Sequence, residues 1–204
     1  NNFPSNLWTK TRFGFRRNDI GNSMNLNPAH YFLKRYHSPD LKPNELKRML
    51  NLWFPFLMNR IQIKSINEDF HEMQVCLRHS FWNRNPNKSV WGGSITSALD
   101  PFFPVMMKQI ILRRGICTDF LSKAVHVEFI RQVKTNIFFQ FKITGKEIIK
   151  AEKKLTNEGK YEGWHYVNGI DAEGNVCVHG KVQVYLRKRW SENVFILSPF
   201  IANF

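Results

Sequence analysis

Asp100 is the only charged residue in the apolar run from Trp91 to Met107, which reads WGGSITSALDPFFPVMM. A carboxylate flanked by Leu99 and Phe102 is expected to lose solvation, which raises its pKa and its reactivity unless partners compensate. Such a group can serve as a general base. Its hydrophobic neighbours therefore make Asp100 the first candidate for a catalytic residue.

A structural role accounts for the same carboxylate. The pair Asp100-Pro101 favours the start of a helix, because Asp can cap free backbone N–H groups and Pro has no N–H to lose at the first helical position. Pro101 also disfavours helical dihedral angles in the residue before it. Local sequence alone leaves both interpretations open: a general base, or a cap on a helix that restarts at Pro101.

Two glycines, Gly92 and Gly93, stand just upstream of this carboxylate. Glycine lets the backbone approach a ligand closely, and N–H groups at a helix start can polarise a carbonyl oxygen. A carboxylate together with such donors indicates acyl transfer. Ser94 follows the glycines without a G-x-S-x-G motif, so we expect a cap or turn role for it rather than a nucleophile.

The elements that must position these residues follow from hydrophobic periodicity. One amphipathic helix is predicted from Pro43 to Leu57, with its apolar face at spacings of three and four. A second, more polar helix is expected from Lys146 to Leu155. Alternating apolar residues predict about six half-buried strands, at Ile61–Ile66, Met73–Leu77, Val125–Phe129, Ile137–Ile143, Trp164–Ile170 and Val176–Leu186. Tight turns between such strands favour an antiparallel sheet, and the apolar helix from Gly93 onward would cover it.

The order of these elements resembles the hotdog fold, an α+β architecture in which an antiparallel sheet of about six strands wraps around a long central α-helix. The resemblance is to its acyl-CoA thioesterases, and most closely to the uncharacterised thioesterase-like family DUF4442, over residues 43 to 190. The segment NRNPNKSVWGGSITSALDP carries it. In one branch of the superfamily an amide side chain stands seven residues before the key glycine, and the acid stands eight after it. Asn85, Gly92 and Asp100 match that spacing.

The resemblance implies three catalytic roles and no cofactor. The Gly92 backbone N–H would polarise the thioester carbonyl, Asn85 would position substrate or water, and Asp100 would act as base or nucleophile. In such dimers the glycine and the acid at one site come from opposite subunits. The chain departs from the family pattern at Trp91, where many relatives have His, at Pro104, where a hydroxyl is common, and at Lys88-Ser89, where the nearest relatives often have Gly-Thr.

Further residues are candidates for substrate binding. Trp91 and Gly93 adjoin the key glycine, and Ser97 or Thr96 could supply the hydroxyl that Pro104 lacks. Trp91, together with Phe81 and Trp82, either lines an acyl pocket or packs in the core, and the core is the favoured interpretation. Arg113 and Arg114 could meet the phosphates of CoA, or simply form a solvated helix end.

Composition bounds the function classes. The 204 residues include 43% hydrophobic ones and carry a formal net charge of +14, which indicates an anionic partner without identifying it. Three cysteines without a C-x-x-C pair argue against a disulfide framework, and the seven histidines show no metal-binding spacing. We therefore expect a protein without a metal, with no stable membrane insertion and, lacking a signal peptide, a cytoplasmic location.

The sequence predicts one principal domain, residues 41–190, between an irregular extension, 1–40, and a tail, 191–204. The leading hypothesis is a homodimeric or tetrameric hydrolase that cleaves acyl-CoA or acyl-carrier thioesters to an acid and a thiol. The alternatives are a non-catalytic protein that binds acyl-CoA or lipid, and a hydroxyacyl-thioester dehydratase. A nucleic-acid binder is the least favoured reading, because no motif supports it.

Overall fold

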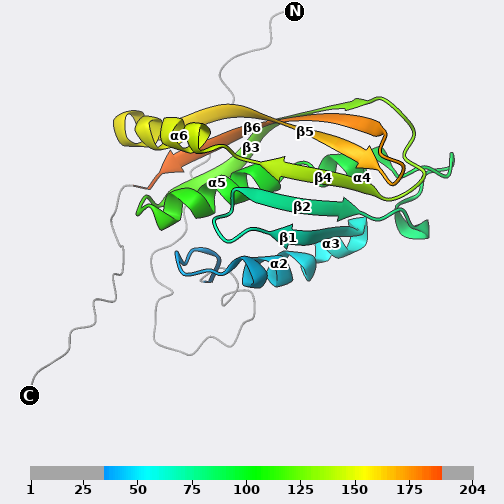
Figure 1. Cartoon of the computed structure of the whole chain (residues 1–204), viewed down its shortest axis with the longest axis horizontal. Helices are drawn as coiled ribbons and strands as arrows, with labels where there is room; N and C mark the ends of the chain where they lie inside the picture. Colours follow the sequence, from blue (N-terminus) through cyan, green and yellow to red (C-terminus); the bar gives the residue numbers. More distant parts are fainter. Residues whose placement is uncertain (1–34, 190–204) are drawn as a thin grey trace, which may run out of the picture.

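A single antiparallel sheet dominates the computed structural model, which describes residues 35–189 (Figure 1). Its strand order is β1-β2-β4-β5-β6-β3. The strands are β1 (Ile61–Ile66), β2 (Glu72–Leu77), β3 (Thr118–Phe129), β4 (Ile137–Lys142), β5 (Lys160–Asp171) and β6 (Val176–Lys188). The predicted number of strands and their antiparallel pairing are confirmed. The predicted tail, 191–204, lies outside the described residues, as does most of the extension.

The turns between neighbouring strands follow the sequence closely. Asn67 closes the β1–β2 hairpin, because its backbone carbonyl accepts the Phe70 N–H at 3.1 Å. Asp171 closes the β5–β6 hairpin, because its Oδ1 accepts the backbone N–H of Asn175 at 2.8 Å. Gly174 in that turn has a φ of 87°, a left-handed conformation that glycine adopts without steric cost.

The central helix is interrupted near Pro101, where the Asp100-Pro101 pair allowed a restart of the long apolar helix. It consists of α4 (Gly92–Ser97) and α5 (Phe102–Arg113), with a turn between them that ends at Pro101. Proline has no N–H and clashes with the preceding helical turn, so the helix restarts after it. All residues from Phe102 to Leu112 are buried. None of the helices in the described part of the chain combines the length and hydrophobicity that crossing a bilayer requires.

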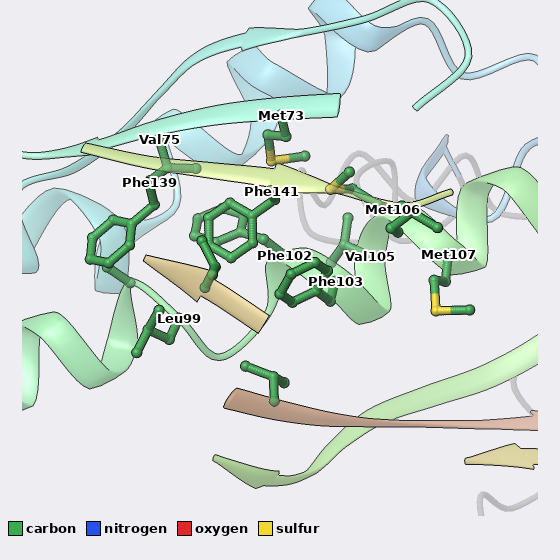
Figure 2. Close-up of a cluster of buried hydrophobic side chains, with 14 of the residues drawn as sticks. Met73, Val75, Leu99, Phe102, Phe103, Val105, Met106, Met107, Phe139 and Phe141 are labelled. Atoms are coloured by element: carbon green, nitrogen blue, oxygen red, sulfur yellow. The ribbon is translucent and has the colours of Figure 1, made fainter. Parts of the chain in front are cut away.

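Aromatic rings join α5 to the inner face of the sheet (Figure 2). The ring centroids of Phe102 and Phe103 each lie 5.0 Å from that of Phe141 on β4. Phe139 and Met73 complete the same buried cluster. Aromatic pairs at this separation stabilise a core beyond the area that they bury. The core therefore holds α5 rigidly, and with it the position of the break at Pro101.

The N-terminal helical segment forms two helices, α2 (Pro43–Asn51) and α3 (Phe54–Asn59), so the prediction of one helix to Leu57 was wrong. In a continuous helix the ring of Pro55 would clash with the carbonyl of Asn51. Helix α2 therefore ends at Asn51, and α3 begins at Phe54. Phe56 is buried instead of Trp53 and Leu57, which are both exposed.

Helix α6 (Gly145–Glu158) packs on β5 and is longer than the predicted Lys146–Leu155. Its start is fixed by a capping box in which Thr144 Oγ1 accepts the Glu147 N–H and Glu147 Oε2 accepts the Thr144 N–H at 2.7 Å. Such reciprocal bonds satisfy backbone donors that a helix start leaves open. The apolar face of α6, which includes Ile148 and Leu155, closes the core on that side.

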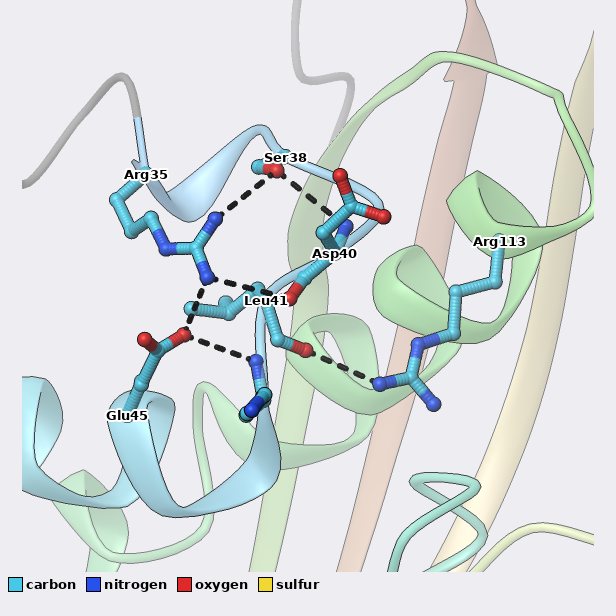
Figure 3. Close-up of polar contacts among 7 residues, drawn as sticks. Arg35, Ser38, Asp40, Leu41, Glu45 and Arg113 are labelled. Carbon is cyan, nitrogen blue, oxygen red and sulfur yellow. Dashed lines mark hydrogen bonds and ion pairs between the residues drawn. The ribbon is translucent and has the colours of Figure 1, made fainter.

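The described end of the predicted extension packs onto the domain (Figure 3). Arg35 donates to Glu45 Oε2 at 2.6 Å and to the Asp40 carbonyl at 3.2 Å. Lys108 Nζ and Gln109 Nε2 of α5 both donate to the Tyr36 carbonyl, at 2.6 and 2.9 Å. Residues 35–41 are thus fastened to the buried helix by hydrogen bonds from its own side chains.

Candidate active site

A cavity of about 380 Å³ lies between the loop that precedes α4 and the residues at and after the end of β3. Two predicted catalytic residues, Asn85 and Gly92, line it together. The facing wall comes from Phe129–Val133. Val90 ties the two walls, because its N–H donates to the Val133 carbonyl at 2.8 Å. The fold therefore brings the predicted amide and the predicted glycine to one concave surface.

Asn85 presents its amide group to this cavity in a defined orientation. Its Oδ1 accepts the Ser89 backbone N–H at 3.1 Å and the Ser89 hydroxyl at 3.0 Å. Because a backbone N–H can only donate, the oxygen must be the atom that faces Ser89. No described residue accepts a hydrogen bond from Asn85 Nδ2. The side chain thus uses its acceptor to close the 85–89 turn and keeps its donor for another group.

Gly92 opens α4, and its N–H has no acceptor among residues 35–189, as is usual for the first donors of a helix. The Trp91 carbonyl instead accepts the N–H groups of Ser94 and Ile95, at 3.0 and 3.3 Å. A Cβ on Gly92 would lie 3.2 Å from Cζ of Phe129. Glycine at this position therefore leaves room for the Phe129 ring, and the residue lines the cavity with a backbone N–H that has no acceptor in the described chain.

Trp91 accounts for the second glycine. A Cβ on Gly93 would lie 2.5 Å from the outer ring atoms of the Trp91 indole, so the indole occupies the space that a side chain would need. Trp91 is exposed, and so are Phe81 and Trp82. The expectation that these three aromatic residues belong to the core was wrong, because Trp91 lies over α4 and the other two lie on a short surface 3-10 helix, η1 (Phe81–Asn83).

A network of buried amides holds the glycine segment in place. Asn83 Nδ2 donates to the backbone carbonyls of Asn59 and Arg78, at 3.1 and 2.9 Å. The backbone carbonyl of Asn83 accepts the Trp91 N–H at 2.7 Å. Ser94 Oγ donates to Asn59 Oδ1 at 2.8 Å. The end of α3, η1 and the start of α4 are thereby joined. Ser94 therefore links α4 to the end of α3, whereas the expected role was a local cap or turn; the N-cap of α4 is Trp91, without a side-chain hydrogen bond.

Asp100 lies outside the cavity in the single chain. It is exposed and belongs to the turn between α4 and α5, so its predicted loss of solvation does not occur here. The neighbours Leu99 and Phe102 point into the core, whereas the carboxylate does not. Asp100 is also no helix cap: Pro101 occupies the N-cap position of α5, without a side-chain hydrogen bond. Its backbone carbonyl accepts the Ser122 hydroxyl of β3.

The other predicted binding residues divide by location. Ser97 ends α4 and is half-buried outside the cavity lining, while the neighbouring Thr96 Oγ1 donates to the Gly92 carbonyl at 3.0 Å. Pro104 is buried in α5. The Thr96 hydroxyl thus bonds to the glycine segment, and Ser97 is a candidate that the single chain does not bring to the cavity.

Arg113 and Arg114 lie at the far end of α5 and already have partners. Arg113 donates to the carbonyls of Glu68 and Leu41, at 2.6 and 3.0 Å (Figure 3). Its guanidinium also lies 4.4 Å from the ring centroid of Phe70. Arg114 pairs with Glu152 at 2.7 Å. Both arginines fasten elements to α5, and the single chain does not place them at the cavity.

Residues after β3 complete the cavity, and the sequence did not single them out. Arg131 and Gln132 line it, and so does Asn87 on the opposite side. Arg131 takes part in no ion pair within residues 35–189. No local pattern marks this wall, because its contribution depends on how the end of β3 meets the 85–92 loop. In the same residues, no three His, Cys, Asp or Glu side chains are grouped as a metal site.

Two buried titratable side chains lie away from the cavity. Burial lowers the pKa of Lys108 to about 7, with a smaller lowering by Arg189. His165 contacts Glu147 at 3.1 Å and stacks 5.1 Å from Phe103. Burial also lowers the pKa of His165, and the nearby Glu147 opposes that effect. Neither Lys108 nor His165 lines the cavity, so we assign both to the stability of the fold and not to catalysis.

A family model described as "Domain of unknown function (DUF4442)" matches residues 44–186. No curated protein matches the chain in sequence.

Several solved structures share the architecture. A protein of unknown function from Pseudomonas aeruginosa, described as a probable thioesterase, is 16% identical with a TM-score of 0.60, and the match covers 72% of this chain and 97% of that one. A thioesterase from Haemophilus influenzae is 9% identical with a TM-score of 0.54, over 74% and 93% of the two chains. The PaaI protein of the E. coli phenylacetic acid degradation operon is 13% identical with a TM-score of 0.50, over 79% and 96%. At such identities the likeness shows the fold, and the predicted hotdog fold is confirmed.

Proposed function

The chain belongs to the DUF4442 family, and on that premise we propose that it is a thioesterase that hydrolyses acyl-CoA or acyl-carrier thioesters to a free acid and a thiol. The observation that carries the proposal is the shared cavity of Asn85 and Gly92, with one unused donor on each residue. Two donors at one concave surface suit a carbonyl oxygen that gains negative charge during acyl transfer. Solved structures of the same fold that are described as thioesterases support the choice of reaction.

The thioester carbonyl binds against the Gly92 N–H in this proposal, while Asn85 Nδ2 donates to the substrate or to the attacking water. Water attacks the carbonyl carbon as Asp100 takes its proton. The tetrahedral intermediate then collapses, the C–S bond breaks, and the thiolate recovers a proton from Asp100. Donors aimed at the developing oxyanion lower the barrier without needing to reorganise. No metal or organic cofactor takes part in these steps.

Asp100 must come from a second subunit for this chemistry. In one chain Asp100 follows the C-terminal end of α4, whereas Gly92 is the first residue of that helix. A helix of this length is about 9 Å long. The bond from Ser122 to the Asp100 carbonyl places this turn beside β3. Strand β3 forms one edge of the sheet and, within residues 35–189, pairs only with β6. We propose a homodimer that pairs through β3, in which Asp100 of the partner subunit completes each cavity.

A non-catalytic role in binding acyl thioesters is the second candidate. Asp100 is exposed in the single chain, and Pro104 provides no hydroxyl near it. A protein of this kind would bind acyl-CoA in the same cavity and release no thiol.

Thiol release from a series of acyl-CoA substrates of increasing chain length tests the proposal. Hydrolysis of at least one member, in a protein whose measured mass is that of a dimer or a larger assembly, is the expected result. Saturable acyl-CoA binding without thiol release at any chain length would instead select the non-catalytic role.

A further inference from the structure

Helix α3 carries an unusual amount of exposed hydrophobic surface. Five large side chains lie outward in seven consecutive positions, and we call them the α3 patch: Leu52, Trp53, Phe54, Leu57 and Met58. Leu52 is 75% exposed and Phe54 68%. Isolated surface apolar residues are common, but a contiguous patch marks an interaction site. The α3 patch is therefore a candidate binding surface.

Contacts with buried residues of the domain hold the α3 patch in place. Phe56, the one buried apolar residue of α3, lies 5.4 Å from Phe102 of the central helix and 5.0 Å from Trp53, measured between ring centroids. The side chain of Asn59 donates to the Pro55 carbonyl at 2.9 Å and stabilises the short helix. The outward side chains are thus held on a fixed base.

Further exposed aromatic rings lie next to the patch. Phe81 and Trp82 of η1 are 78% and 79% exposed, and η1 packs against α3. Trp is enriched at the interface between membrane and water, and Trp, Phe and Leu form the apolar face of helices that lie in that interface. Figure 1 shows α3 beside β1. Because β1 is the sheet edge opposite β3, the patch stays open when two copies pair through β3.

The charges around the patch have one sign. Residues 46–67, which contain the patch, and residues 73–99 contain Lys and Arg but not a single Asp or Glu. The acids between the two ranges, Glu68, Asp69 and Glu72, lie at the β1–β2 turn, at the end of β1 away from α3. The ion pairs between Lys or Arg and acids in the described part of the chain all lie elsewhere. An apolar surface framed by unpaired basic side chains is complementary to an anionic bilayer.

A small cavity of about 150 Å³ adjoins the α3 patch, and Arg60 and Arg78 both line it. Leu57 of the patch and Gln62 of β1 also contribute. The two arginines belong to adjacent chain segments, since the Arg78 N–H donates to the Arg60 carbonyl at 3.0 Å. Guanidinium groups bind phosphate through paired hydrogen bonds. This cavity therefore has the chemistry to hold a phosphate beside an inserted apolar helix.

We infer that the α3 patch docks the protein on the surface of an anionic membrane, with Phe54 and Leu57 at the acyl boundary and Arg60 and Arg78 on a lipid phosphate. This binding lies on the surface and needs no spanning segment. Nucleic acid would use the same arginines but gains nothing from exposed aliphatic side chains such as Leu52 and Met58. The apolar component therefore favours a lipid surface. The inference is independent of the proposed hydrolysis.

Sedimentation with vesicles tests the inference, using phosphatidylcholine alone and phosphatidylcholine mixed with phosphatidylglycerol at physiological salt. Wild type is expected to sediment with the anionic vesicles. Arg60→Gln combined with Arg78→Gln should weaken the partition coefficient about 25-fold, since each basic residue contributes about fivefold. Phe54→Ser should weaken it about tenfold through lost apolar burial. Both sets of side chains are exposed, so folding is expected to be intact by circular dichroism.

Matched controls on α6 separate this surface from general basicity. Lys150→Gln with Lys153→Gln removes the same charge, and Ile149→Ser removes an equally exposed apolar side chain. Both controls should bind vesicles like wild type. Absence of wild-type binding, or equal losses in controls and test variants, overturns the inference. So does a drop in oligomeric mass with Phe54→Ser, which would mean that copies of the chain bury the patch. Single-stranded RNA binding that needs the arginines but not Phe54, without vesicle binding, would assign the surface to nucleic acid.

Discussion

Asn85 Oδ1 accepts two hydrogen bonds from Ser89, one from its backbone N–H and one from its hydroxyl. The carbonyl half of the amide is therefore structural, while the amino half has no acceptor among residues 35–189, and Asn85 lines a cavity together with Gly92. One side chain thus divides into a part that shapes the loop and a part that can bind substrate. Substitutions can separate the two.

Asn85→Asp keeps the Oδ1 acceptor for both hydrogen bonds from Ser89 but removes the Nδ2 donor. We expect its free energy of unfolding to stay within about 0.5 kcal/mol of wild type, while kcat/KM for thioester hydrolysis falls about tenfold through loss of one hydrogen bond. Asn87→Asp adds the same charge to the same cavity and leaves the Asn85 donor intact. Equal losses of kcat/KM in both variants would point to charge alone and contradict a donor role for Asn85.

Asn83 makes hydrogen bonds with both ends of its buried amide. Asn83→Ala leaves the carbonyls of Asn59 and Arg78 without that donor, so we expect the free energy of unfolding to fall by about 2–3 kcal/mol. Denaturant unfolding measures this. Asn87→Ala, at an exposed position of the same loop, should change it by no more than about 0.5 kcal/mol. A loss in Asn83→Ala as small as that of the control would remove Asn83 from the support of the glycine segment.

Lys108 should make stability depend on pH. Burial lowers its pKa from 10.5 to about 7, so between these values the unfolded chain binds more protons than the folded one. Stability contributed by this group is then fully present above the unfolded pKa and is lost as the pH falls from 10.5 towards 7, by at most about 1.4 kcal/mol per pH unit.

Lys108→Met removes this dependence and leaves Gln109 as a donor to the Tyr36 carbonyl. The variant should therefore gain stability relative to wild type at pH 6, and the gain should shrink at pH 9. Urea unfolding at the two pH values measures the difference, with the exposed Lys150→Met as a control. The same stability difference at both pH values would show that Lys108 keeps its charge in the folded state.

The sequence predicted the sheet well because alternation records burial directly. Ile137, Phe139 and Phe141 are all buried on β4, as their spacing requires. The helices were harder, since Pro55 breaks a periodic apolar run that otherwise looks continuous. The break at Pro101, in contrast, was one of the two readings of the Asp100-Pro101 pair. The resemblance to hotdog thioesterases selected Asn85 and Gly92, which the structure places in one cavity.

The rest of the site depends on contacts that local sequence does not encode. Arg131 and Gln132 reach the cavity because β3 ends beside the 85–92 loop, a relationship between segments about 40 residues apart in sequence. Asp100 has hydrophobic neighbours in sequence, but they turn into the core and leave its carboxylate exposed. Its role rests on a second subunit, and no pattern within one chain fixes that geometry.

The rate of thioester hydrolysis by Asp100→Asn tests the central claim most directly. Asparagine has nearly the same shape and, at an exposed turn, should leave the fold and the dimer unchanged, but it cannot accept the proton of the attacking water. A general base contributes about 10²–10⁴-fold, so we predict that kcat falls at least 100-fold while acyl-CoA binding is retained. Turnover by Asp100→Asn at the wild-type rate would contradict the account.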